Sequence, residues 1–131
     1  MKVLLVEDQE LFRSGLVMLL EDEDDLEICG EAETGRQAIE LAGKTEAEVV
    51  VLDVNLPDMS GMDVTRAVKE HSMDTKVLIL TAHDTEDYLL EAKAAGADGF
   101  LLKRSAPDRL PEAIRCVGRG EEFLDEEVLD R

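Results

Sequence analysis

Residues 49–61 read VVVLDVNLPDMSG, and this stretch decides the fold. Its first four residues are all aliphatic, which is typical of a strand buried on both faces of a parallel sheet. Asp53 ends the run, and a Pro-Asp pair and a Ser-x-Gly stretch follow it directly. Because a buried charge is costly unless something pairs with it, Asp53 at the end of such a strand predicts a compensating cation nearby.

Similar apolar runs recur along the chain and alternate with helical patterns. The predicted strands cover residues 3–6, 26–31, 49–53, 76–81 and 99–102. Between them, Thr34-x-x-Gln37 and Ser60-x-x-Asp63 have the form of helix starts. The alternation predicts a (βα)5 α/β fold with a doubly wound parallel five-stranded sheet. We choose the flavodoxin-like strand order 2-1-3-4-5 among the doubly wound folds.

The last two helices carry their own boundary signals. A helix from about Thr85 to Ala95 should end at Gly96, which suits a left-handed C-cap. The next helix contains Pro111, which would lie inside it if the helix began at Pro107. We therefore expect a late or irregular start, with Asp108 as the N-cap.

Length and composition limit the classes of protein. The chain has 131 residues, 44% of them hydrophobic, which suits one globular domain. Its formal net charge of −18 disfavours direct contact with nucleic acid or an anionic membrane. Cys29 and Cys116 lack a CxxC spacing and are interpreted as reduced, packed thiols. Since no signal peptide or membrane span is visible, we expect a cytoplasmic protein.

Charged and polar residues follow the predicted strands. In an open α/β sheet, ligands bind outside the carboxyl ends of the strands, where the strand order reverses. The residues expected at that edge are Glu7, Asp8, Asp53, Thr81 and Lys103. The fold should therefore gather three carboxylates, one hydroxyl and one ammonium at a single edge.

This set of groups suits phosphoryl chemistry on a carboxylate. Carboxylates are the hard oxygen ligands that Mg²⁺ prefers, and the absence of Cys and His ligands argues against zinc. With the metal bound, Asp53 can act as a nucleophile toward phosphorus, stabilised by the ammonium and hydroxyl donors. Taken singly, Asp8 could be a helix N-cap, Thr81 an ordinary strand-end residue and Lys103 a solvated lysine; their joint placement at different strand ends favours a site. His83 is interpreted as an exposed loop residue rather than a catalytic one.

Four segments carry a family resemblance: LLVEDQ, VVVLDVNLPDMSG, VLILTAHD and AAGADGFLLK. They resemble the signature segments of bacterial two-component response regulator receiver domains, which share the CheY-like fold, and the resemblance covers nearly the whole chain. It implies a switch that accepts a phosphoryl group on Asp53 from a histidine kinase or phosphotransfer protein. It also implies intrinsic self-phosphorylation and autodephosphorylation chemistry, rather than an enzyme in the ordinary sense.

The resemblance also assigns roles to individual residues. Asp53 matches the phosphoacceptor, and Glu7 and Asp8 match the acidic pair that holds Mg²⁺ (or Mn²⁺ in its place), with Asp8 the direct ligand. The remaining matches are the backbone carbonyl of Asn55 for the metal, Thr81 for the switch hydroxyl, Ala82 for a backbone amide, Lys103 for the phosphoryl-pairing lysine and Phe100 for the rotating aromatic. Tyr88 does not match the aromatic position and is interpreted as a helix-face residue.

Lys103 is followed by Arg104 rather than by the proline of many receivers. In lacking this proline, the chain resembles the LuxR/NarL-type subfamily. Receivers of that subfamily usually precede a helix-turn-helix DNA-binding domain. We expect residues 1–118 to form the receiver, and residues 119–131 to form an acidic tail or the start of a linker, more mobile than the core. The output is then a DNA-binding domain missing from this chain, or the protein is a stand-alone phosphorelay receiver.

Two other classes of protein share parts of this pattern but differ from it at one position or loop each. A Mg²⁺-dependent phosphatase with an aspartate nucleophile usually carries a second Asp two residues later, where this chain has Asn55. A flavodoxin needs a Ser-, Thr- and Gly-rich loop after the first strand, where this chain has Glu7-Asp8-Gln9.

As partner we expect a second copy of this chain on phosphorylation. The two copies would meet through the fourth helix, fifth strand and fifth helix, or through the first and fifth helices.

Overall fold

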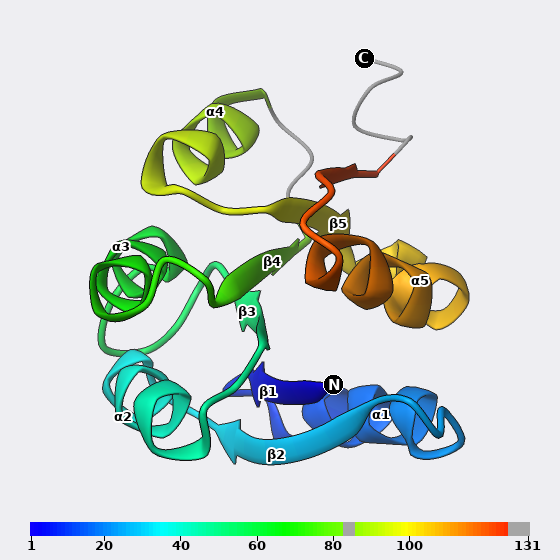
Figure 1. Ribbon diagram of the computed structural model, residues 1–131. Coiled ribbons are helices and arrows are strands. Elements are labelled where there is room, and N and C mark those ends of the chain that lie inside the picture. The colour runs from blue at the N-terminus through cyan, green and yellow to red at the C-terminus, as the bar shows by residue number, and fades with distance from the viewer. Residues whose placement is uncertain (83–85, 126–131) are drawn as a thin grey trace.

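The computed structural model describes residues 1–82 and 86–125, apart from the side chains of residues 86 and 87. A parallel sheet runs through its centre, with helices on both faces (Figure 1). The strands are β1 (Lys2–Val6), β2 (Glu27–Ala32), β3 (Val49–Asp53), β4 (Lys76–Thr81), β5 (Gly99–Leu102) and β6 (Phe123–Leu124). Their order is β2-β1-β3-β4-β5-β6, which confirms the predicted order 2-1-3-4-5 and adds a sixth strand at one edge.

The helices divide between the two faces of the sheet. They are α1 (Glu10–Glu21), α2 (Gly35–Thr45), α3 (Gly61–His71), α4 (Glu86–Ala95) and α5 (Ala106–Gly118), with a 3-10 turn η1 (Lys103–Ser105). Helices α2, α3 and α4 lie on one face, and α1 and α5 on the other (Figure 1). None of the helices within the described ranges is long and apolar enough to cross a membrane.

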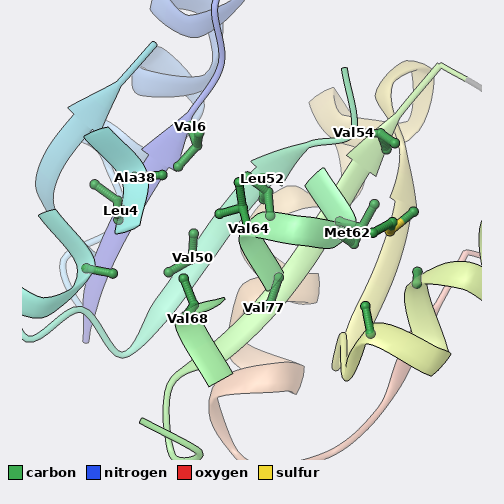
Figure 2. Close-up of a cluster of buried hydrophobic side chains, with 14 of the residues drawn as sticks. Leu4, Val6, Ala38, Val50, Leu52, Val54, Met62, Val64, Val68 and Val77 are labelled. Carbon is green, nitrogen blue, oxygen red and sulfur yellow. The ribbon is translucent and has the colours of Figure 1, made fainter. Parts of the chain in front are cut away.

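The central strands are apolar on both sides because each side faces helices. Val50 and Leu52 of β3 point into the cluster under α2, α3 and α4, where they meet Val64 of α3 (Figure 2). Val49 and Val51 point the other way, into the cluster under α1 and α5. All five residues of β3, including Asp53, are buried, as the sequence predicted for this strand.

Local signals place most helix boundaries. Thr34 accepts a hydrogen bond from the amide of Gln37 (3.1 Å), and Ser60 accepts one from the amide of Asp63 (3.2 Å), so both predicted helix starts are confirmed. Gly96 follows α4 with a φ of +100°, which confirms the left-handed C-cap. Both cysteines are free and half-buried.

The start of α5 differs from the prediction. The helix begins at Ala106, not after Asp108, so the assignment of Asp108 as N-cap is wrong. The turn η1 already shapes the backbone, because the amide of Ala106 donates to the carbonyl of Lys103. Ala106 is itself buried (1% exposed), so packing fixes an early start and leaves Pro111 inside the helix. The expected irregularity is thus the 3-10 turn that precedes α5.

Strand β6 lies within the segment expected to be a tail. It pairs in parallel with β5, and Phe123 is buried in the cluster under α1 and α5. Asp125 is 1% exposed; its amide donates to the carbonyl of Phe100 (3.0 Å) and its carboxylate accepts from the amide of Leu102 (3.1 Å). Residues 123–125 are therefore packed on β5, while residues 126–131 lie outside the described part of the chain.

Candidate functional site

Three carboxylates meet at the carboxyl edge of the sheet. Glu7 and Asp8 directly follow β1, and Asp53 ends the neighbouring strand β3. One oxygen from each lies within 4.8 Å of the others. Glu7 and Asp53 are buried, whereas Asp8 is exposed. The structure therefore brings together the acidic residues that the sequence placed at two strand ends.

Lys103 joins this cluster from the start of η1, directly after β5. Its Nζ lies 2.8 Å from Oε1 of Glu7 and 3.4 Å from Oδ2 of Asp53. Partial burial of the lysine lowers its pKa, but the contacts with Glu7 and Asp53 outweigh this effect, so the pKa is raised overall. Lys103 is therefore held in its charged form as the compensating cation expected for Asp53.

The cluster has three carboxylates, and Lys103 contacts two of them, Glu7 and Asp53, so within the described part of the chain its negative charge is not balanced. The contact of Lys103 with Oε1 of Glu7 is close but not aligned as a hydrogen bond, so this buried oxygen has no hydrogen-bond donor within residues 1–82 and 86–125. Hard oxygen donors, excess negative charge and an unsatisfied buried oxygen fit Mg²⁺ or Mn²⁺. Glu7, Asp8 and Asp53 are the residues that would hold the ion.

The loop after β1 is fixed by a side chain that the sequence analysis did not single out. Arg13 of α1 is mostly buried and donates through Nη1 to the carbonyl of Glu7 (2.7 Å). The same guanidinium pairs with Glu31 (3.0 Å) and Glu33 (3.1 Å) at the end of β2. The N-cap of α1 is Gln9, so the capping alternative for Asp8 does not hold. Arg13 thus anchors the backbone that presents Glu7 and Asp8.

The loop after β3 is fixed from two directions. Asp58 accepts from the amides of Gly35 (2.7 Å) and Arg36 (3.0 Å) at the start of α2, and these bonds lower the pKa of its carboxyl group. A side chain at Gly61 would place its Cβ 2.7 Å from the carbonyl of Asp53, so the close turn into α3 needs glycine. Asn55, whose amide donates to Oδ1 of Asp53 (3.3 Å), is held between these two points.

The remaining predicted residues surround the acidic cluster at different depths. Thr81 ends β4 beside Leu102 and is fully buried, whereas Ala82 is exposed. Phe100 of β5 is 1% exposed and packs in the core cluster under α2, α3 and α4. His83 lies outside the described residues.

An aromatic ring that the sequence analysis also missed lies beside the lysine. Nζ of Lys103 is 4.7 Å from the ring centroid of Phe12, a residue in the first turn of α1. Phe12 also lines an apolar groove of about 690 Å³ between α1 and the start of α5, together with Leu11, Leu16 and Pro107. The exposed Leu11 (88%) marks the outer side of this groove.

Comparison with known proteins agrees with this arrangement. The family model of the response regulator receiver domain matches residues 3–115. The chain belongs to this family. The receiver is 35% identical over 128 residues to a nitrate/nitrite response regulator homolog of Haemophilus influenzae, covering 98% of this chain and 62% of that protein. It is 38% identical to the nitrate/nitrite response regulator NarP of Escherichia coli, covering 97% of this chain and 59% of the relative.

A solved structure extends the likeness to the fold. It is a LuxR-family two-component response regulator from Aurantimonas sp. SI85-9A1, with a TM-score of 0.94, 29% identity, and coverage of 98% of this chain and 92% of the other. This receiver is therefore of the NarL/LuxR type. It spans about three fifths of the length of the two nitrate/nitrite regulators.

Proposed function

We propose that this receiver takes a phosphoryl group onto Asp53 from the phosphohistidine of a sensor kinase or phosphotransfer protein in the cytoplasm. One observation carries the proposal: Asp53 ends a fully buried central strand, within reach of two more carboxylates and one ammonium. Such a cluster is costly to bury without a ligand, and phosphoryl transfer uses this set of charges.

In the proposed step, a carboxylate oxygen of Asp53 attacks phosphorus. The bond from phosphorus to the imidazole nitrogen of the donor breaks, and the electron pair stays on that nitrogen. Lys103, 3.4 Å from Oδ2 of Asp53, is placed to pair with the negative phosphoryl oxygens. The Asn55 amide already donates to Oδ1, which orients the carboxylate for attack.

Glu7, Asp8 and Asp53 would hold Mg²⁺, with the backbone carbonyl of Asn55 as the proposed fourth protein ligand. A divalent ion supplies charge neutralisation for the incoming phosphoryl oxygens. The donor set and the unsatisfied oxygen of Glu7 support this assignment.

The same site would release the group and signal its presence. We propose that water slowly hydrolyses the acyl phosphate, so the domain is a self-resetting switch. The Thr81 hydroxyl and the Ala82 amide would donate to the phosphoryl oxygens. Phe100, one strand away from Thr81, would adjust to the movement of Thr81. The buried position of both side chains supports such a coupling, because a shift of one requires the other to repack.

The partners are proposed from the relatives. Those proteins are named as response regulators, and this receiver spans only part of their length. We propose that it controls a DNA-binding domain in a longer protein and makes no DNA contact itself, with the residues after Asp125 as the connection. A stand-alone phosphorelay receiver remains the second candidate. A phosphorylation-promoted homodimer is favoured at the α1–α5 groove, because β6 already pairs with the outer edge of β5.

The test is incubation with acetyl phosphate and Mg²⁺, followed by intact-protein mass spectrometry. Wild type should gain one phosphoryl group, and Asp53→Asn should gain none. Asp63→Asn, which changes an exposed carboxylate on α3, is the matched control and should be phosphorylated like wild type. A mass shift that survives Asp53→Asn would contradict the assignment.

A further inference from the structure

We propose that Phe12 is a positioning residue for phosphoryl transfer, because its ring holds the ammonium of Lys103 over the acidic cluster. The inference rests on the proposed function, since it assigns a role within that reaction. Nζ of Lys103 lies 4.7 Å from the centroid of the ring, within the range of a cation–π interaction.

The lysine needs such a restraint. Its side chain is flexible, with four rotatable bonds. Its Nζ lies closer to Oε1 of Glu7 (2.8 Å) than to Oδ2 of Asp53 (3.4 Å). A lysine drawn fully to Glu7 would leave the phosphoryl oxygens of Asp53 without their cation. The ring of Phe12 offers the ammonium a third, uncharged contact that keeps it between the two carboxylates.

The backbone at Lys103 adds to this need. A residue before proline is restricted to extended conformations, but Arg104 follows here, and Lys103 opens the 3-10 turn η1. Lys103 therefore leaves the extended backbone of β5 in this turn, and the direction of its ammonium depends on the contacts of its side chain. The side chain is nevertheless only 18% exposed, which requires packing against its surroundings.

Phe12 is rigid enough for this task. It lies in the first turn of α1 and packs against the buried cluster that α1 and α5 share. The neighbouring Arg13 ties the same turn to the carbonyl of Glu7 (2.7 Å). The ring and the carboxylate that compete for the ammonium are therefore held on one anchored segment, so their relative positions are fixed.

The experiment compares initial rates of phosphorylation by acetyl phosphate in saturating Mg²⁺. Phe12→Leu keeps an apolar side chain but removes the aromatic face, and it should slow the reaction by about three- to tenfold. Phe12→Tyr keeps the aromatic ring, and its rate should stay within about twofold of the wild-type rate. Met18→Ala, which changes an exposed apolar side chain farther along α1 and outside the groove, should leave the rate unchanged.

A double-variant cycle separates positioning from a general effect on the fold. In a Lys103→Met background, Phe12→Leu should have no further effect on the rate, because the ammonium that the ring holds is gone. Phe12→Met serves in place of Phe12→Leu if thermal unfolding shows that the leucine variant is not folded. An equal slowing with and without Lys103 would overturn the proposal.

NMR supplies a readout that does not need the reaction. The Cε protons of Lys103 should be shifted upfield by the ring in wild type and in Phe12→Tyr, but not in Phe12→Leu. Unchanged shifts or an unchanged rate in Phe12→Leu would overturn the inference and leave the proposed function intact. A wild type that takes up no phosphoryl group would overturn both.

Discussion

Two carboxylate sites at opposite edges of the sheet, one partly buried and one with two buried members, differ in how their charge is balanced. At the amino-terminal edge, Asp98 precedes β5 and pairs with Lys69 of α3 (2.6 Å). The same carboxylate accepts from the amide of Val77 (2.8 Å). At the carboxyl edge, Glu7, Asp8 and Asp53 lie together, and Lys103 contacts only Glu7 and Asp53 among the described carboxylates.

The difference separates a structural charge from a binding site. Asp98 has one cation and one amide, so its charge is satisfied within the fold and ties α3 to β4 and β5. The acidic cluster has more negative charge than residues 1–82 and 86–125 neutralise, so we expect it to be complete only when a cation binds. A buried charge that the fold leaves unbalanced therefore indicates a ligand, whereas a balanced one indicates packing.

The largest expected effect comes from breaking the balanced site. Asp98→Ala leaves the ammonium of Lys69 and the amide of Val77 without their acceptor, and it should lower the free energy of unfolding by about 2–4 kcal/mol. Urea denaturation measures this loss. Asp74→Ala, at an exposed position on the same edge, should change stability by less than about 0.5 kcal/mol. A free energy of unfolding for Asp98→Ala equal to that of the control would show that the pair with Lys69 does not stabilise the fold.

The second expected effect comes from completing the unbalanced site. Mg²⁺ at one hundred times its dissociation constant should raise the free energy of unfolding of wild type by about 2.7 kcal/mol, because the ion binds only the folded cluster. Asp8→Asn should reduce that gain and stabilise the metal-free protein, since it removes one of three repelling charges. Urea denaturation with and without Mg²⁺ tests both. The Asp98 variant, if it stays folded, should respond to Mg²⁺ like wild type; an equal gain in Asp8→Asn would exclude Asp8 from the site.

The sequence predicted the site at the carboxyl edge but not the pair between Asp98 and Lys69. The residues of this site lie at the end of a strand or directly after one, so the parallel topology alone was enough to bring Glu7, Asp8, Asp53 and Lys103 together. Nothing in the local pattern linked Asp98 to Lys69, because the pair joins elements 29 residues apart and has no fixed spacing. Strand ends are predictable from periodicity, whereas side-chain pairs between helices and loops depend on the final packing.

The supporting contacts of the site were missed for the same reason. Arg13 and Phe12 lie on the helical pattern of α1, where an arginine and an aromatic residue are ordinary, and only the fold shows that they reach Glu7 and Lys103. Asp58 belongs to a turn, where aspartate needs no special explanation. Strand β6 has two residues, too few for a periodic signal, and the acidic residues around it favoured a tail.

The smallest expected effect concerns a third cluster, in which one arginine pairs with two solvent-exposed or half-exposed carboxylates. Arg115 of α5 pairs with Asp25 (2.8 Å) and Glu23 (2.5 Å) beyond the end of α1, and the side chain of Asp25 is 58% exposed. The hydrogen bond from Arg115 lowers the pKa of Asp25 from 3.8 to about 2. Because the folded-state pKa is the lower one, the pair stabilises the fold above pH 4, and this contribution is lost as the pH falls toward 2. The unfolding free energy of wild type should therefore fall more steeply over this range than that of Asp25→Asn, while the control Asp24→Asn should keep the wild-type slope. Since exposed ion pairs are screened by water and salt, the difference in slope should be small and should shrink further in 0.5 M salt. A difference of unchanged size in 0.5 M salt would contradict the assignment of this pair as a screened surface interaction.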